Sequence, residues 1–81
     1  MTQSQWRWSG EALRDTLNAR GISIRQFHKM LADAGIELSS GCVRNYLYGA
    51  TEPRISMAVR FALVLGMRPV DITSWLERAD D

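Results

Sequence analysis

Apolar residues recur at spacings of three and four along most of this 81-residue chain. This spacing predicts amphipathic helices, and no sustained alternation of apolar and polar positions predicts a strand. Glycines separate the periodic segments where a left-handed residue would end a helix, at positions 21, 35, 49 and 66. We therefore predict an all-α fold of five short helices joined by tight turns.

The second predicted helix has the clearest start. Ser23 followed by Gln26 fits a capping box, in which the serine hydroxyl accepts from the third backbone amide and the glutamine reaches back to the cap. Ser9 or Gly10 is expected to begin the first helix, and Ser39 is a good N-cap for the third.

The last two predicted helices differ in character. Residues 56–65 are apolar nearly all round, and a helix of this kind is expected to be buried in the middle of its domain. Residues 69–80 are expected to form a fifth helix, because Pro69 suits a first helical position and Asp71 suits the first turn. The apolar stripe of this helix consists of Ile72, Trp75, Leu76 and Ala79.

The charge is spread unevenly, although the formal net charge is only +1. Residues 20–60 carry six basic and three acidic side chains, whereas residues 61–81 carry two basic and four acidic ones. We therefore expect a positive face in the middle of the chain and an acidic end. So small an excess does not by itself indicate nucleic-acid binding.

Length and composition exclude several classes of protein. The chain is one domain at most and has no room for a layered catalytic scaffold. Cys42 is the only cysteine, which excludes an intramolecular disulfide and a cysteine zinc site. His28 is the only histidine, and the chain offers no plausible nucleophile–base pair for catalysis. Residues 1–5 show no secretory signal, and the longest apolar run, 61–65, is too short to span a membrane. We expect a soluble cytoplasmic protein that is not an enzyme, with no cofactor, metal, membrane or small-molecule ligand.

The second and third predicted helices form a candidate helix-turn-helix over residues 23–49. Residues 20–27, RGISIRQF, resemble the opening of this motif in the Cro-like phage-repressor (XRE) family. Residues 39–53, SSGCVRNYLYGATEP, resemble the recognition helix of that family with its closing glycine and proline loop. Residues 61–66, FALVLG, resemble the end of its fourth helix.

The resemblance covers most of the chain and implies one lambda-repressor-like DNA-binding domain over residues 1–81. Residues 1–8 would be an N-terminal arm, and residues 69–80 a candidate dimerisation helix. The chain departs from the family pattern at His28, where the family usually has a small alanine, and in a longer turn before the third helix.

DNA recognition also follows from the residue types. A major groove about 12 Å wide admits one helix, and Arg44 and Asn45 suit two-hydrogen-bond contacts with guanine and adenine. The alternative for Arg44 and Asn45 is that they are solvated surface residues. The alternative for Ser39 is that it serves only as a helix cap. The predicted base-contacting residues are Ser40, Gly41, Arg44 and Asn45. The predicted phosphate-contacting residues are Arg25, Gln26, Ser39, Tyr48 and Arg54, with Arg25 or Gln26 replacing the family's glutamine, which falls on Ile24.

Three tryptophans lie near the ends of the chain, outside the motif. In one interpretation Trp6 and Trp8 cover the fifth helix and Trp75 completes the core. In the other, an arm and helix form a dimer interface, since aromatic residues are enriched at interface cores. The predicted interface residues are Trp6, Trp8, Trp75, Leu76 and Ala79.

The sequence thus predicts a small phage- or plasmid-type transcriptional repressor. Such a protein binds a palindromic operator in double-stranded DNA as a homodimer, with two half-sites about 34 Å apart. The alternative is a protein-interaction module of antitoxin or adaptor type, in which DNA binding is secondary. An accessory DNA-bending role also remains open.

Overall fold

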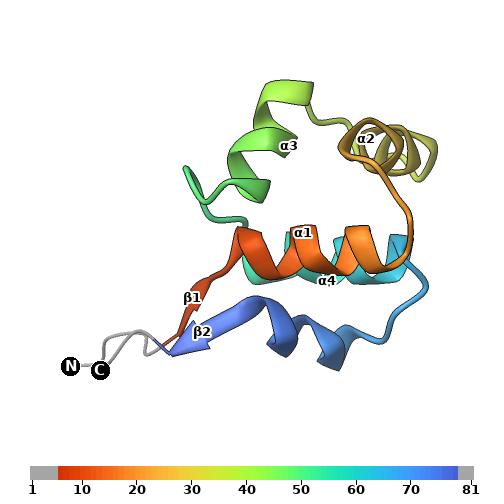
Figure 1. Ribbon diagram of the computed structural model, residues 1–81. Helices are drawn as coiled ribbons and strands as arrows, with labels where there is room; N and C mark the ends of the chain where they lie inside the picture. The colour runs from red at the N-terminus through yellow and green to blue at the C-terminus, as the bar shows by residue number, and fades with distance from the viewer. Residues whose placement is uncertain (1–5, 79–81) are drawn as a thin grey trace.

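Two helices lie side by side at the middle of the structure, a computed structural model that describes residues 6–78. They are α1 (Gly10–Ala19) and α4 (Ile55–Val64). Above them in Figure 1 lie α2 (Ile24–Asp33) and α3 (Ser40–Leu47), which contact each other. The described part of the chain is mostly helical, as the periodicity predicts.

The last layer corrects the predicted fifth helix over 69–80. Here a 3-10 helix, η1 (Pro69–Trp75), leads into a short strand, β2 (Leu76–Arg78), which pairs antiparallel with β1 (Trp6–Trp8). Inside η1, the side chains of Thr73 and Ser74 donate to backbone carbonyls three residues earlier, at 3.0 and 2.8 Å. Such local bonds compete with the α-helical ladder. The fold is therefore helical with a two-stranded ribbon.

Serine caps begin the first three helices. The Ser23 hydroxyl accepts from the Gln26 amide at 3.0 Å and the Gln26 side chain accepts from the Ser23 amide at 2.9 Å, which confirms the capping box. Ser9 caps α1 and Ser39 caps α3, each accepting from the amide three residues on. The four predicted helix-ending glycines all have positive φ, between 68° and 84°, in which a side chain would be strained.

Phe61 of α4 lies at the centre of the core and is fully buried. Its ring makes edge-on or tilted contacts with Phe27 of α2, Tyr46 of α3 and Trp8 of β1, at centroid distances of 5.4, 5.9 and 6.4 Å. Trp75 packs edge-on against Trp8 at 6.0 Å. Aromatic contacts among five elements thus fix α2, α3, β1 and η1 around α4.

The fourth helix lies in the middle layer of the fold, as expected, but it is only partly buried. Ala58, Phe61 and Ala62 are buried, but Ile55 and Leu63 are 59% and 56% exposed. Both α2 and η1 pack against α4, but so short a chain does not cover every side of the helix, so part of its apolar surface meets solvent. Within residues 6–78, no helix has the length and apolar character needed to cross a membrane.

Candidate nucleic-acid interface

The two faces of α3 differ in their surroundings. Val43 and Leu47 are buried against the core. The opposite face is exposed and carries Ser40, Gly41, Arg44, Asn45 and Tyr48. All four predicted base-contacting residues and one predicted phosphate-contacting residue therefore lie on one solvent-facing surface.

The N-terminal end of α3 is capped by Ser39. Its hydroxyl oxygen accepts from the Cys42 amide at 3.0 Å, so the interpretation of Ser39 as a cap is confirmed. The side chain is exposed, and its own hydrogen is available to donate to a phosphate oxygen. A cap and a phosphate contact are therefore compatible at this residue.

The C-terminal end of α3 is attached to the start of the chain. The Trp8 indole N–H donates to the Tyr46 carbonyl at 2.6 Å, and Arg14 Nε donates to the Leu47 carbonyl at 2.9 Å. Both carbonyls belong to the last turn of the helix, whose backbone oxygens have no partner within the helix. β1 and α1 thus hold α3 in place while its outer face stays exposed.

Arg14 also supports Tyr48. Its guanidinium lies 4.7 Å from the centroid of the Tyr48 ring, within the range of a cation–π contact. Sequence reasoning missed Arg14 as a site residue, because nothing in the helical pattern of α1 reveals that it reaches the end of α3. The contact places one cation and one phenol hydroxyl at the edge of the exposed surface.

Two shallow hollows flank the start of α2. The first, about 260 Å³ in volume, lies between α2 and α3. Its lining consists of Ile24, Arg25, His28, Ser40 and Arg44. The second, about 180 Å³, lies between α1, α2 and Tyr48 and includes Arg14, Asn18 and Ser23. No acidic side chain lines either hollow, so this surface attracts anions.

The predicted phosphate-contacting residues on α2 and α4 have different surroundings. Arg25 and Arg54 are exposed, and neither forms an ion pair with any residue in 6–78. Gln26 is exposed too, but its side-chain oxygen is used in the capping box, so only its amide N–H groups can reach a phosphate. The geometry brings Arg25 beside Arg44, while Arg54 lies at the start of α4.

His28 has a structural partner. Its Nε2 donates to the Leu38 carbonyl at 2.7 Å and ties α2 to the connection before α3.

Tyr46 and Cys42 interact within α3. A hydrogen bond with the Cys42 side chain, together with burial, raises the pKa of Tyr46 above its ordinary value of 10.0. Tyr46 is therefore a neutral packing residue at physiological pH. In the described part of the chain, no three histidine, cysteine or acidic residues gather as a metal site.

The predicted dimer-interface residues separate into two groups. Trp75 is fully buried and Trp8 is 8% exposed, so both belong to the core of one copy, which corrects their assignment to an interface. Trp6 is 52% exposed and Leu76 is half-buried. Ala79 lies outside the described residues.

No family model, curated protein or solved structure matches this chain.

Proposed function

We propose that this protein is a cytoplasmic, sequence-specific transcriptional repressor. It binds a palindromic operator in double-stranded DNA as a homodimer, with α2 and α3 as a helix-turn-helix and α3 in the major groove. Arg44 and Asn45 read base edges, and Ser40 and Gly41 allow a close approach. Arg25, Ser39 and Tyr48 contact phosphates on either side.

The observation that carries this proposal is the outer face of α3. It presents Arg44 and Asn45, the two side-chain types that make paired hydrogen bonds with guanine and adenine, to solvent. Arg44 forms no ion pair with any residue in the described part of the chain, so its guanidinium is available. The buried side chains of α3 pack against the core, and Trp8 and Arg14 donate hydrogen bonds to its last two carbonyls, so the helix has a fixed position.

The charge around α3 supports the same function. Arg14, Arg25 and Arg44 lie in or beside the two hollows, which contain no carboxylate. Other cations have structural tasks: Arg20 donates to the Leu65 carbonyl at 2.8 Å, and Arg68 pairs with Asp71 at 3.3 Å. The small net charge therefore conceals a locally cationic surface, which favours phosphate contacts.

Selection of bound duplexes from a random DNA pool tests the proposal. We expect a palindromic consensus, and we expect affinity for it to fall steeply as salt rises. In fluorescence anisotropy, Arg44→Ala should weaken binding to the consensus by about 5- to 150-fold, the loss of one paired contact worth about 1–3 kcal/mol. Binding to unrelated DNA should change much less.

Arg60→Ala is the matched control, because Arg60 is an exposed arginine on α4 and lines neither hollow. It removes the same charge and should keep the sequence preference. A parent protein that enriches no sequence would contradict the proposal and favour the protein-interaction alternative. If Arg44→Ala and Asn45→Ala bind the consensus as well as the parent does, α3 is not the recognition helix.

A further inference from the structure

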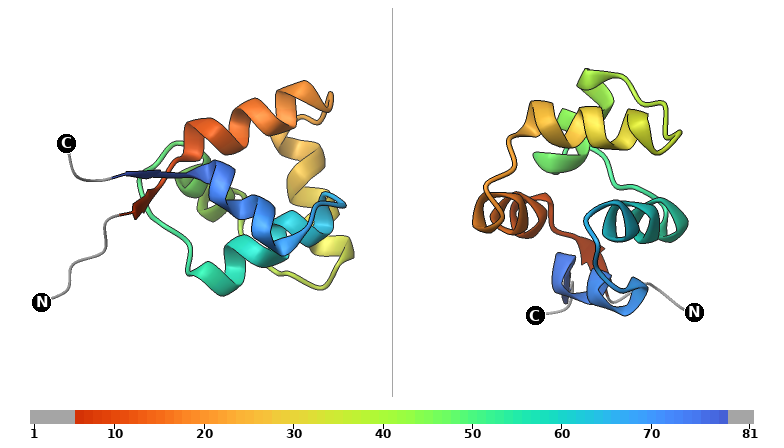
Figure 2. Two further views of the ribbon diagram at one scale, coloured as in Figure 1. Left: turned by 90° about the horizontal axis from the view of Figure 1, so that it is seen from below. Right: turned by 90° about the vertical axis from the view of Figure 1, so that its right-hand side faces the viewer.

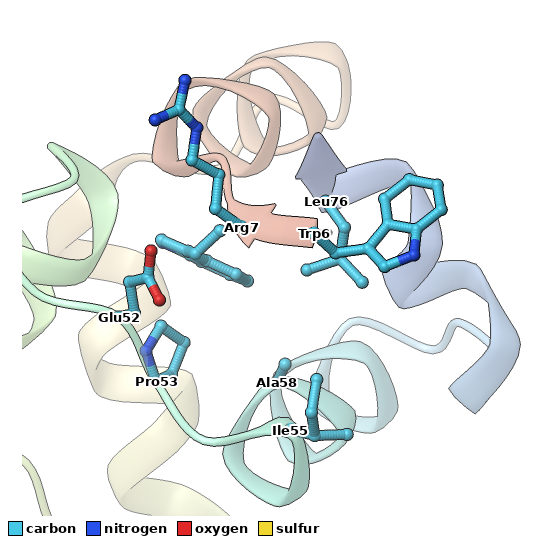
Figure 3. A pocket seen from close by; sticks show the side chains of 8 residues that line it. Trp6, Arg7, Glu52, Pro53, Ile55, Ala58 and Leu76 are labelled. Atoms are coloured by element: carbon cyan, nitrogen blue, oxygen red, sulfur yellow. The ribbon is translucent and has the colours of Figure 1, made fainter. Parts of the chain in front are cut away.

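A third hollow, of about 330 Å³, lies away from the α2–α3 surface. Figure 3 shows Trp6 and Arg7 of β1 on one wall, and Glu52, Pro53 and Ile55 of the α3–α4 loop and first turn of α4 on the other. Trp6 and Ile55 are 52% and 59% exposed. Trp6 and Ile55 therefore present apolar surface to solvent on opposite walls of this hollow.

We propose that this hollow is the interface with a second copy of the chain, in which Arg7 of each copy pairs with Glu52 of the other. The inference builds on the proposed function, which needs two copies on one operator. A two-fold axis brings one surface patch against itself, so that residue i meets residue j and residue j meets residue i. A patch with one cation and one anion is complementary to itself under that symmetry.

The charges on this patch favour a second copy over nucleic acid. Arg7 and Glu52 are both exposed, and neither forms an ion pair with any residue in 6–78. In Figure 3 the guanidinium of Arg7 points away from the hollow and does not reach over it to Glu52. Glu52 would repel a phosphate. Two symmetric Arg7–Glu52 pairs around Trp6 and Ile55 give the polar rim and apolar centre of a protein interface.

The position of the hollow suits two-site binding. β1 and the α3–α4 loop lie at one end of the molecule (Figures 1 and 2). A two-fold axis at this end, parallel to the direction in which the layers stack, keeps α3 of both copies in the same outer layer of the dimer. Both recognition helices then face one side, as a palindromic operator requires.

Charge reversal tests the pairing in the full-length protein without DNA. Sedimentation equilibrium should show a dimer for the parent and a dissociation constant at least tenfold higher for Arg7→Glu and for Glu52→Arg, because each variant places like charges opposite one another twice. An equimolar mixture of the two variants should dimerise as the parent does, because every pair then joins opposite charges. Arg60→Glu on α4 is the control and should leave the dimer unchanged.

Three results would overturn the interface: a monomeric parent, single variants that dimerise like the parent, or a mixture that stays monomeric. Circular dichroism on each variant shows whether a loss of dimer comes from unfolding. Binding of Arg7→Glu to a single half-site separates the two proposals. If half-site binding persists while the charge test fails, only the interface is wrong; if dimers form and none binds DNA, only the repressor function is wrong.

Discussion

Gly10 is the glycine at which an added methyl group would meet the closest neighbouring atoms. A Cβ at Gly10 would lie 2.5 Å from the carbonyl oxygens of both Tyr46 and Leu47. These atoms are backbone and cannot rotate away. Gly10→Ala must therefore push α1 and the end of α3 apart, at the point where Trp8 and Arg14 donate to the same two carbonyls.

The expected loss follows from these contacts. Overpacking against a rigid neighbour costs about 1–3 kcal/mol, and weakening a hydrogen bond adds about 1 kcal/mol. Against this, alanine gains at most about 1 kcal/mol over glycine in a helix. We expect Gly10→Ala to lower the free energy of unfolding by about 2 kcal/mol. For a domain of this size the Tm then falls by about 8–16 °C.

Gly41→Ala is the matched control. A Cβ at Gly41 has the Ser39 hydroxyl as its nearest neighbour, at 4.0 Å, so there is space for it. The same substitution should therefore raise the free energy of unfolding by about 0.4–1 kcal/mol. Urea denaturation followed by tryptophan fluorescence measures both variants. A Gly10→Ala protein within about 0.5 kcal/mol of the parent, or a Gly41→Ala protein destabilised as much as Gly10→Ala, would show that close packing at Gly10 does not limit the side chain there.

Three further results are expected. Gly41→Ala, although more stable, should bind the selected operator more weakly than the parent in fluorescence anisotropy, because its methyl group lies on the face of α3 that we propose approaches DNA. Unchanged affinity would mean that another surface contacts the groove. Ser23→Ala should lower the free energy of unfolding by about 1 kcal/mol in urea denaturation, since it removes the hydroxyl that accepts from the Gln26 amide at the start of α2. The backbone amide and the guanidinium of Arg68 lower the pKa of Asp71 below its ordinary 3.8, so this carboxylate stabilises the fold above that pH and the benefit is lost as pH falls through the lowered pKa. Asp71→Asn should therefore be less stable than the parent near neutral pH and should equal it in strong acid, and a constant difference at every pH would contradict the assignment.

The helices could be predicted from the sequence because their signals are local. The capping box at Ser23 and Gln26 and the glycines that end each helix act within one turn of chain, and the structure has them where the pattern places them. The β1–β2 ribbon has no such local signal. Each strand has three residues, too few for a visible alternation, and Trp8 pairs with Leu76 across most of the chain. The predicted fifth helix is therefore confirmed only over Pro69–Trp75, as a 3-10 helix, and gives way to β2 at Leu76.

The candidate site divides in the same way. Val43 and Leu47 face the core at helical spacing, so the exposure of Arg44 and Asn45 follows from periodicity alone. The contacts of Arg14 with Leu47 and Tyr48 cannot be predicted from periodicity, because they depend on how α1 crosses the end of α3. The proposed pairing of Arg7 with Glu52 of a second copy is also not predictable from the sequence, because the two residues come to one surface only in the folded chain.

The residues that stabilise α3 are separate from those that would read DNA. Its buried side chains and its last two carbonyls bind the rest of the fold, whereas the Arg44 side chain forms no hydrogen bond or ion pair with any residue in 6–78. Substitutions at Arg44 should therefore change binding with little change in stability, because an exposed side chain without partners contributes little to the folded state. In the proposed function, the operator preference can then change without loss of the fold. If Arg44→Ala unfolded the protein, this separation of roles would be wrong, and the exposed face of α3 would have a structural function instead.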